Sequence, residues 1–291
     1  MEIPYTISTR PDTGLWNAKI GIWLFLASEV MLFGGLFSAY IFLRLDAPPG
    51  MWPHGLLNVP IGTMNTAILI LSSVTVVLAW ASLKMRKYNA YWWWMLLTIV
   101  CGLVFLTVKL SLEWPDKFHH FGAFIKPEAL EKYEKYLGNH RLTEKGLPPR
   151  LEITGHLHNQ EAWKNPGIKE YEVALDPIYA DPDNPENDRP HFLPHHATDT
   201  VATIEKEDIQ RAGFFTPDHS TFFATYFTIT GLHGLHVLGG VLVFIYMWLP
   251  VSKKIYQRNP EHLANRVEVS GLFWHFVDLV WIFVFPLFYL L

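Results

Sequence analysis

Five long apolar runs constrain this 291-residue chain more than any other feature. A membrane-spanning helix needs about 20 mostly apolar residues, because each residue rises about 1.5 Å through a hydrocarbon layer about 30 Å thick. The five runs that reach this length cover residues 17–44, 56–83, 90–112, 219–249 and 267–291. The sequence therefore predicts an all-α integral membrane protein with five transmembrane helices.

The composition supports this class of protein and excludes others. Half of the residues are hydrophobic and 12 are tryptophan, which is typical of membrane proteins with aromatic residues at both interfaces. The formal net charge is −4, and no cluster of lysine and arginine alternates with aromatic residues, so we expect no nucleic-acid partner. The single cysteine, Cys101, lies within the third run, which excludes an internal disulfide framework.

The basic residues between the runs predict the orientation of the chain in the membrane. Loops on the cytoplasmic side carry an excess of lysine and arginine. Such residues gather after the second run and in the loop after the fourth run, at Lys84, Arg86, Lys87, Lys253, Lys254, Arg258 and Arg266. The turn after the first run, residues 46–55, carries none. We therefore expect a cytoplasmic N-terminus and an external C-terminus.

A hydrophilic insert of 103 residues, 116–218, separates the first three runs (1–115) from the last two (219–291). It holds 19 Asp and Glu against 12 Lys and Arg, a net charge of −7. The predicted orientation places the insert on the external side of the membrane. Ten prolines interrupt it, and we expect an α-rich cap with extended loops, in which short helices cover residues 127–138 and 203–213.

Eight of the 14 histidines also lie in this insert. The pairs His156/His158 and His195/His196 have spacings that a metal site can use. Because short histidine spacings are common in any histidine-rich segment, we predict no metal site in this chain.

Ionisable residues occur inside four of the five runs, where they are costly unless they face other helices or water. They are Glu29 in the first run, Lys109 and Glu113 in the third, His233 and His236 in the fourth, and His275 and Asp278 in the fifth. Glu29 lies 12 residues beyond Asn17, and Asp278 lies 12 residues beyond Arg266. Both carboxylates should therefore lie roughly 18 Å from the cytoplasmic end of their helices.

The spacing of these residues predicts which helix faces meet, since residues three or four apart share a face. In the fourth run one face carries Tyr226, Thr230, His233, His236 and Gly240, and in the fifth run one face carries Gly271, Trp274, His275 and Asp278. Small residues allow such faces to pack closely, and the polar groups then find partners across the contact.

Three interpretations of the intramembrane polar residues remain open. They form hydrogen bonds between helices and nothing more, or they bind a polar group such as a lipid head group, a proton or a water chain. In the third interpretation His233 and His236 are haem or metal ligands, which requires further ligands from other helices. Lys109 and Glu113 are four residues apart, and we expect them to form a pair near the outer end of the third run.

Four sequence stretches together resemble subunit III of the haem-copper respiratory oxidases. They are ASEVMLFGGLF from Ala27, LNVPIGTMNTAILI from Leu57, STFFATYFTITGLHGLHV from Ser220 and WHFVDLVWIFVF from Trp274. Their order, with a glutamate in the first helix and histidines in the last two, makes the match specific. The resemblance covers residues 15–113 and 218–291, in the five-helix form that lacks the first two helices of the seven-helix form.

The resemblance implies an accessory subunit of a cytochrome c oxidase in the bacterial inner membrane, with haem and copper in partner subunits. Such a subunit packs on the catalytic subunit I, beside subunit II, binds phospholipid between its helices and supports proton uptake during oxygen reduction. It contributes no catalytic residue and no metal ligand. The motif positions assign an intramembrane polar cluster, related to lipid or protons, to Glu29, Asn65, Thr66, His233, His236, His275 and Asp278, and Glu113 matches a glutamate that ends the third helix.

The acidic insert lies outside this resemblance. We expect it to contact a basic cytochrome c domain or a neighbouring respiratory complex, which favours cytochrome c as the electron donor. The alternatives are subunit III of a quinol oxidase, a standalone proton or ion transporter that uses the midplane charges, and a scaffold that acts through its insert. The transporter is disfavoured because the sequence shows no internal repeat and five is an odd number for inverted halves.

Overall fold

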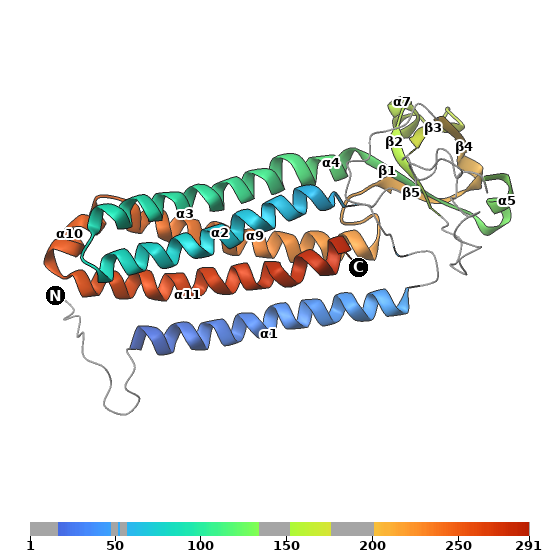
Figure 1. The fold of residues 1–291 in the computed structure, drawn as a ribbon. Coiled ribbons are helices and arrows are strands. Elements are labelled where there is room, and N and C mark those ends of the chain that lie inside the picture. The colour runs from blue at the N-terminus through green and yellow to red at the C-terminus, as the bar shows by residue number, and fades with distance from the viewer. Residues whose placement is uncertain (1–16, 48–51, 53–56, 134–151, 176–200, 291) are drawn as a thin grey trace. The chain divides into compact units, whose positions relative to one another are not determined.

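The computed structural model describes residues 17–47, 52, 57–133, 152–175 and 201–290 (Figure 1). These residues include five helices that are long and apolar enough to cross a membrane. They are α1 (Asn17–Asp46), α2 (Val59–Lys84), α3 (Tyr88–Val108), α9 (Thr221–Trp248) and α11 (Pro260–Phe285). A π-helical turn, Lys109–Glu113, and α4 (Trp114–His119) extend the third span, and a second π-helical turn, Pro286–Leu290, extends the fifth. The prediction of five apolar helices is confirmed.

The fifth helix begins at Pro260, earlier than the predicted start at Val267. The side chain of Asn259 caps this helix by accepting a hydrogen bond from the backbone N–H of His262 at 3.2 Å. Pro260 fits the first helical turn because that turn has no intrahelical acceptor for its N–H groups. The polar sequence between Pro260 and Arg266 is therefore helical although it is not apolar.

The chain divides into two compact units. The first comprises residues 1–37, 63–109 and 229–287, and the second comprises residues 38–62, 110–228 and 288–291. The first unit holds most of the long helices, and the second holds the remaining helix ends and a β-sheet. The predicted domain boundaries at 115/116 and 218/219 stay a prediction.

The centre of the first unit is the side chain of Trp274 on α11, which is fully buried. Its indole Nε1 donates a hydrogen bond to Ser72 Oγ on α2 at 2.9 Å. A Cβ atom added at Gly102 of α3 would lie 2.8 Å from Trp274 Cη2, and one at Gly240 of α9 would lie 2.7 Å from Cε3. The two glycines therefore make the room into which the indole packs, and one side chain joins α2, α3, α9 and α11.

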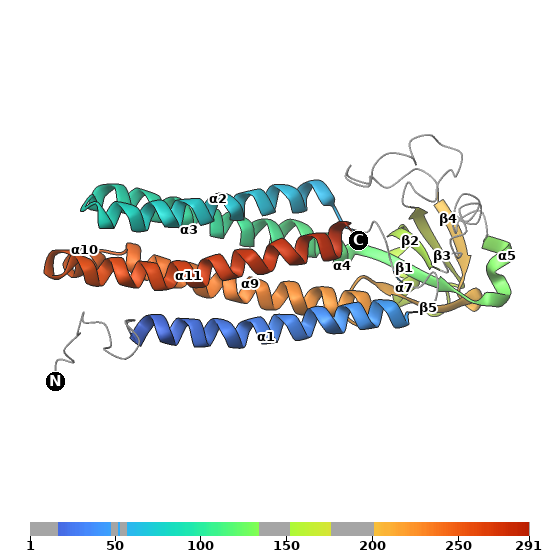
Figure 2. The same cartoon turned by 60° about the horizontal axis from the view of Figure 1, so that its bottom comes forward.

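Further hydrogen bonds connect the same four helices, which lie side by side in both views (Figures 1 and 2). The hydroxyl groups of Thr75 and Thr98 lie 2.8 Å apart, and Tyr91 donates to the Met247 carbonyl at 2.8 Å. A short helix, α10 (Val251–Arg258), follows α9 and contacts α11. At this end of the unit Glu261 accepts from Lys84 at 3.0 Å and from Arg86 at 3.1 Å. Polar side chains of the described helices thus pair with one another across helix contacts.

The second unit contains a five-stranded antiparallel sheet with the strand order β4-β3-β2-β1-β5. The strands are β1 (His120–Ile125), β2 (Glu152–Leu157), β3 (Glu170–Leu175), β4 (Val201–Glu205) and β5 (Ile209–Phe214). Two short α-helices, α5 (Leu130–Tyr133) and α7 (Gln160–Lys164), and two 3₁₀ turns, Pro127–Ala129 and Lys206–Asp208, lie between the strands along the chain. The prediction of an all-α protein is therefore wrong for this part of the chain.

The sheet follows from an alternation of apolar residues with period two. Alternate residues of the first four strands, apart from Gly155, are buried in one cluster, which includes Phe121, Ala123, Ile125, Ile153, Leu157, Tyr171, Val173, Leu175, Ala202 and Ile204. The strand register places these residues opposite one another, as in Ala123↔Ile153, Leu157↔Val173 and Tyr171↔Ile204. One face of the sheet therefore forms the core of the insert.

The two helices predicted within the insert are corrected by the structure. Residues 203–213 form the end of β4, a 3₁₀ turn and most of β5, because Ala202 and Ile204 alternate into the sheet core. The charged residues of this stretch favour a helix only through local propensity, which tertiary packing overrides. The predicted helix 127–138 is helical from Pro127 to Tyr133, and its remainder lies outside the described residues.

An ion-pair cluster joins the turn before β5 to α5. Lys132 Nζ lies 2.8 Å from Asp208 Oδ2 and 2.9 Å from Glu205 Oε1, and the Tyr133 hydroxyl donates to Asp208 at 2.8 Å. The hydrogen bonds from Lys132 and Tyr133 hold the pKa of Asp208 below its ordinary value of 3.8. Asp208 therefore stabilises the folded sheet in its charged form.

This cluster predicts that the stability of the folded insert falls in acid. A carboxyl group whose pKa is lowered by folding stabilises the folded state above its unfolded pKa of about 3.9, and this stability is lost as the pH falls through the folded pKa. At neutral pH the Asp208→Asn variant should be cleaved faster within residues 116–218 than the wild type. The ratio of the two proteolysis rates should approach one as the pH falls below the folded-state pKa of Asp208. A ratio that stays constant over this range would contradict the assigned role.

A second prediction concerns the space that Gly240 leaves for the Trp274 indole. Gly240→Ala should destabilise the helices by about 1–3 kcal/mol, because the added methyl group overlaps the indole. The matched control is Gly239→Ala, since nothing lies within 4 Å of a Cβ added there. The thermal midpoint of the purified protein should fall for Gly240→Ala and stay unchanged or rise for Gly239→Ala. Equal midpoints for the two variants would show that the indole does not pack against Gly240.

Candidate functional site

Glu29 on α1 pairs with His236 on α9. The Glu29 Oε2 to His236 Nε2 distance is 2.9 Å, and the side chains are 13% and 14% exposed. His236 Nδ1 lies 2.7 Å from the Leu232 carbonyl oxygen, which can only accept, so Nδ1 carries a proton. The contact with Glu29 therefore holds one further proton, either on the carboxyl group or on Nε2. The ring of Phe33 covers the pair from α1, with its centroid 5.4 Å from that of His236.

His275 and Asp278 of α11 share a partner on α2. Ser73 Oγ lies 2.9 Å from His275 Nδ1 and donates to Asp278 Oδ2. Because the hydroxyl proton goes to the carboxylate, His275 Nδ1 is the donor to Ser73, and the three groups form a directed chain. Asp278 is buried, and its Oδ1 atom has no hydrogen-bond partner among the described residues.

His233 of α9 contacts a different helix from His236. Its Nε2 lies 3.1 Å from the Val277 carbonyl oxygen on α11, so Nε2 is the donor. The ring packs against Phe105 and Trp281, with centroid distances of 5.5 and 4.8 Å. The two histidines of the predicted face thus connect α9 to α11 and to α1.

Asn65, Thr66 and Lys109 gather around Trp281 and Phe105. Asn65 Nδ2 donates to the Phe105 carbonyl at 3.4 Å, and Thr66 Oγ1 accepts from Trp281 Nε1 at 2.9 Å. Lys109 is 3% exposed, and its ammonium lies 5.0 Å from the centroid of the Trp281 ring. A cation over an indole face is stabilised by the ring quadrupole, so this ammonium has a favourable position within the helices.

Glu113 lies in the second unit and is held by tyrosines. Its Oε1 accepts a hydrogen bond from Tyr226 at 2.6 Å and another from Tyr289. All three side chains are buried. Lys109 and Glu113 therefore contact different aromatic groups, and the predicted pair between them stays a prediction.

The predicted cluster of polar residues is divided among separate contacts. Glu29 with His236, His233 with Val277, and His275 with Asp278 each join two helices. Within the described part of the chain no hydrogen bond links these three contacts to one another. They can each hold or orient a proton, and none of them resembles a set of ligands around one ion.

Two contacts between polar residues were not predicted from the sequence. Ser73 links His275 to Asp278, and its only signal is a serine pair, Ser72 and Ser73, in an otherwise apolar run. Glu152 of β2 pairs with His219 at 2.8 Å, with side chains 4% and 1% exposed. A Cβ atom at Gly122 would lie 2.2 Å from Glu152 Oε1, so this pair requires a glycine on β1. No local periodicity joins residues so far apart in the sequence.

The histidine pairs of the insert have different outcomes. His156 lies on β2 opposite His120 of β1, with ring centroids 4.7 Å apart. His195 and His196 lie outside the described residues. Among the residues that the structure describes, no three His, Cys, Asp or Glu side chains come together as a metal site would need.

Comparison with known proteins gives a family match. The model of the family described as cytochrome c oxidase subunit III matches residues 12–119 and 200–291. These two ranges contain all five candidate membrane-spanning helices. Residues 120–199, which include β1, β2 and β3, lie outside the match.

Curated relatives resemble nearly the whole chain at low identity. Cytochrome c oxidase subunit 3 of Alkalihalophilus pseudofirmus is 24% identical over 277 residues, which cover 94% of this chain and 87% of the relative. A probable quinol oxidase subunit 3 of Staphylococcus haemolyticus is 22% identical over 98% of this chain and 94% of its own length. A heme-copper oxidase subunit I+III of Aeropyrum pernix is 25% identical over 94% of this chain and 22% of its own length.

The Glu29–His236 contact predicts energetic coupling between α1 and α9. We expect Glu29→Ala and His236→Ala to destabilise the protein non-additively, with a coupling energy of about 0.5–2 kcal/mol, because both remove the same hydrogen bond. Thermal midpoints of the two single variants and the double variant measure this coupling. The control cycle combines His236→Ala with Asp278→Ala, which should be additive within about 0.5 kcal/mol. Additivity in both cycles would show that Glu29 and His236 do not interact.

Proposed function

The chain belongs to the cytochrome c oxidase subunit III family, and we propose that it is the non-redox subunit of a proton-pumping cytochrome c oxidase. In this proposal it packs on the catalytic subunit and supports proton uptake during the reduction of oxygen to water. The observation that carries the proposal is the family match over all five apolar helices.

Association with subunits I and II is the first part of the proposal. It is supported by the relative from Aeropyrum pernix, whose name places subunits I and III in one chain. It is also supported by the large apolar side chains that α1 exposes, such as Leu24 (70%), Met31 (73%) and Phe42 (71%). Exposed apolar surface of this extent suits contact with other membrane subunits or with phospholipid.

Haem and copper belong to the partner subunits in this proposal, and no catalytic residue is assigned here. The hydrogen bonds of His236, which engage both of its ring nitrogens, support this assignment for that residue. His236 is held between the Leu232 carbonyl and Glu29, and His233 donates to the Val277 carbonyl. A metal ligand would need a ring nitrogen directed at a common centre with other ligands.

Support of proton uptake is assigned to the intramembrane polar pairs. The Glu29–His236 contact holds one proton beyond that on His236 Nδ1, as derived from its geometry. The hydrogen bonds from His275 to Ser73 and from Ser73 to Asp278 orient the Asp278 carboxyl group within the helices. Ionisable residues at membrane depth are functional candidates because they are costly to keep there.

The orientation in the membrane is proposed from the basic residues. Lys84, Arg86 and the basic residues of α10 lie at one end of the first unit, where Glu261 pairs with the first two. We place this end in the cytoplasm of a bacterium, so that the protein lies in the inner membrane with its sheet outside. The acidic insert would then face the side on which an external cytochrome c donates electrons.

A quinol oxidase is the second candidate, and the Staphylococcus haemolyticus relative favours it. The helices of this chain do not discriminate between the two, because other subunits bind the donor. The insert favours cytochrome c through its net charge of −7, which complements a basic partner.

The test of the proposal is purification through a tag on this chain, followed by a reduced-minus-oxidised optical spectrum and oxygen uptake. We expect haem signals in the purified complex and oxygen uptake driven by reduced cytochrome c. Uptake driven by quinol alone would favour the second candidate. A colourless preparation of the single chain would contradict both and favour a standalone transporter.

The role of the insert predicts an effect of its exposed carboxylates. Replacing Glu128, Glu161 and Glu170 together by glutamine should raise the KM for cytochrome c and weaken its dependence on salt, because surface charges steer association through a screened field. The control replaces Lys164 and Lys169 by glutamine. This change should lower the KM for cytochrome c or leave it unchanged. A KM and salt dependence unchanged by the glutamate variant would remove cytochrome c as the partner of these carboxylates.

A further inference from the structure

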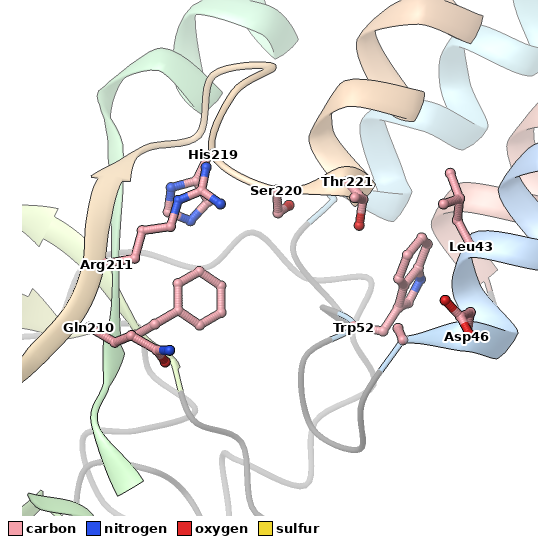
Figure 3. A pocket seen from close by; sticks show the side chains of 10 residues that line it. Leu43, Asp46, Trp52, Gln210, Arg211, His219, Ser220 and Thr221 are labelled. Carbon is pink, nitrogen blue, oxygen red and sulfur yellow. The ribbon is translucent and has the colours of Figure 1, made fainter.

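Two cavities of the second unit differ in the charge of their linings. Figure 3 shows the larger one, of about 550 Å³, in which Asp46 lies on the side away from Arg211, so that its lining holds both an acid and a base. The smaller cavity, of about 300 Å³, is lined by the end of α4, by α7 and by residues of β2 and β5. Its lining includes the bases His119, His156 and Lys164, and none of the described residues that line it is Asp or Glu. The smaller cavity is therefore suited to an anion, although the insert carries a net charge of −7.

The short helix α7 supplies polar groups to this smaller cavity. Gln160, Trp163 and Lys164 line it, and their spacing of three and four residues places them on one face of the helix. Ala162 is fully buried in the core of the sheet, which fixes the position of α7. The Lys164 ammonium and the Gln160 amide have no hydrogen-bond partner among the described residues. Both groups are therefore available to a ligand, and their N–H groups suit an acceptor such as a carboxylate.

Aromatic rings supply the apolar part of the lining. Trp163 and Phe118 are 43% and 41% exposed, which leaves much of each ring uncovered. The Phe118 ring is stacked on Phe227 of α9, with the two centroids 5.4 Å apart. The Trp163 indole contacts Phe214 of β5 edge to face, with a centroid distance of 5.4 Å. Both rings are thus held in position before a ligand binds, which lowers the entropic cost of binding.

We propose that the smaller cavity binds a small aromatic carboxylate. The ring of the ligand packs against Trp163 and Phe118, and its carboxylate contacts Lys164 and Gln160. The volume of about 300 Å³ lies at the lower end of the range of about 300–1,000 Å³ for small-molecule pockets, so the ligand carries one ring rather than an extended ring system. Ring contacts and a charge-assisted hydrogen bond then act on the two ends of one molecule.

This inference goes beyond the proposed function. Gln160, Trp163 and Lys164 lie within residues 120–199, which the family model does not match. Binding of the ligand therefore depends on the insert and requires neither haem nor an electron donor. Oxidase activity without ligand binding would refute only this inference, and ligand binding by a chain that purifies without haem would refute only the proposed function.

The test measures the displaceable binding of three labelled probes to the full-length protein, purified in detergent with any subunits that accompany it. Phenylpropanoate carries a ring and a carboxylate, phenylpropanamide carries only the ring, and hexanoate carries only the carboxylate. The wild type should bind phenylpropanoate more tightly than either of the other two probes. Binding of hexanoate as tight as that of phenylpropanoate would overturn the proposal, because the aromatic lining would then contribute nothing.

Variants of Lys164 test the charged end of the site. Lys164→Gln should weaken the binding of phenylpropanoate by about three- to fivefold, because an exposed ammonium forms an ion pair that solvent screens. The same variant should bind phenylpropanamide within about twofold of the wild type, and Lys164→Arg should bind both probes as the wild type does. Equal weakening of both ring-bearing probes by Lys164→Gln would indicate a structural effect and would overturn the proposal.

Two further variants are controls for charge. Lys169→Gln removes an exposed lysine outside the cavity, and Arg211→Gln removes a base from the lining of the larger cavity. Both should bind phenylpropanoate within about twofold of the wild type. A loss in Arg211→Gln that exceeds the loss in Lys164→Gln would place the anion in the larger cavity and overturn the proposal.

Variants of Trp163 test the aromatic end of the site. Trp163→Leu should weaken the binding of phenylpropanoate and of phenylpropanamide alike, by about three- to tenfold, because both probes lose a ring contact. Trp163→Phe keeps a ring at this position and should bind both probes within about threefold of the wild type. Equal binding by Trp163→Leu and the wild type, or equal losses in the two variants, would contradict the assigned contact.

Discussion

Polar groups within an apolar helical bundle must find partners on other helices, and in this protein the packing of Trp274 brings those helices together. Its indole lies between Gly102 and Gly240 and donates to Ser72, so that α2, α3, α9 and α11 meet around one side chain. The other polar contacts of this unit depend on that packing. Ser73 reaches His275 and Asp278 only when α2 and α11 are adjacent, and His233 reaches the Val277 carbonyl only when α9 and α11 are adjacent.

The contact with α9 gives the position of Glu29 within an apolar helix a physical explanation. A lone carboxylate on a membrane helix is costly, whereas Glu29 shares a proton with His236, whose other nitrogen is fixed by the Leu232 carbonyl. The contact gives both side chains a hydrogen-bond partner within the helices.

The helices could be predicted from the sequence because length and hydropathy are local properties. The spacing of His233, His236 and Gly240 on one helix predicted a shared face of α9, and the structure directs the two histidines to different helices, α11 and α1. The partners of these residues could not be predicted. Ser73 lies about 200 positions from His275, and nothing in its local sequence selects it over Ser72. The sheet was missed because Glu and Lys in residues 203–213 favour a helix locally, whereas the alternation of Ala202 and Ile204 becomes decisive only when β3 pairs beside them.

The central claim is that the polar residues within the helices have partners on other helices, with Glu29 and His236 as the pair that holds a proton. A density map of the assembled complex, at a resolution that shows side chains, tests it most directly. The account predicts the Glu29 carboxylate within hydrogen-bond distance of His236 Nε2, with Nδ1 on the Leu232 carbonyl. A map in which Glu29 turns away from α9, toward lipid or another subunit, would contradict it.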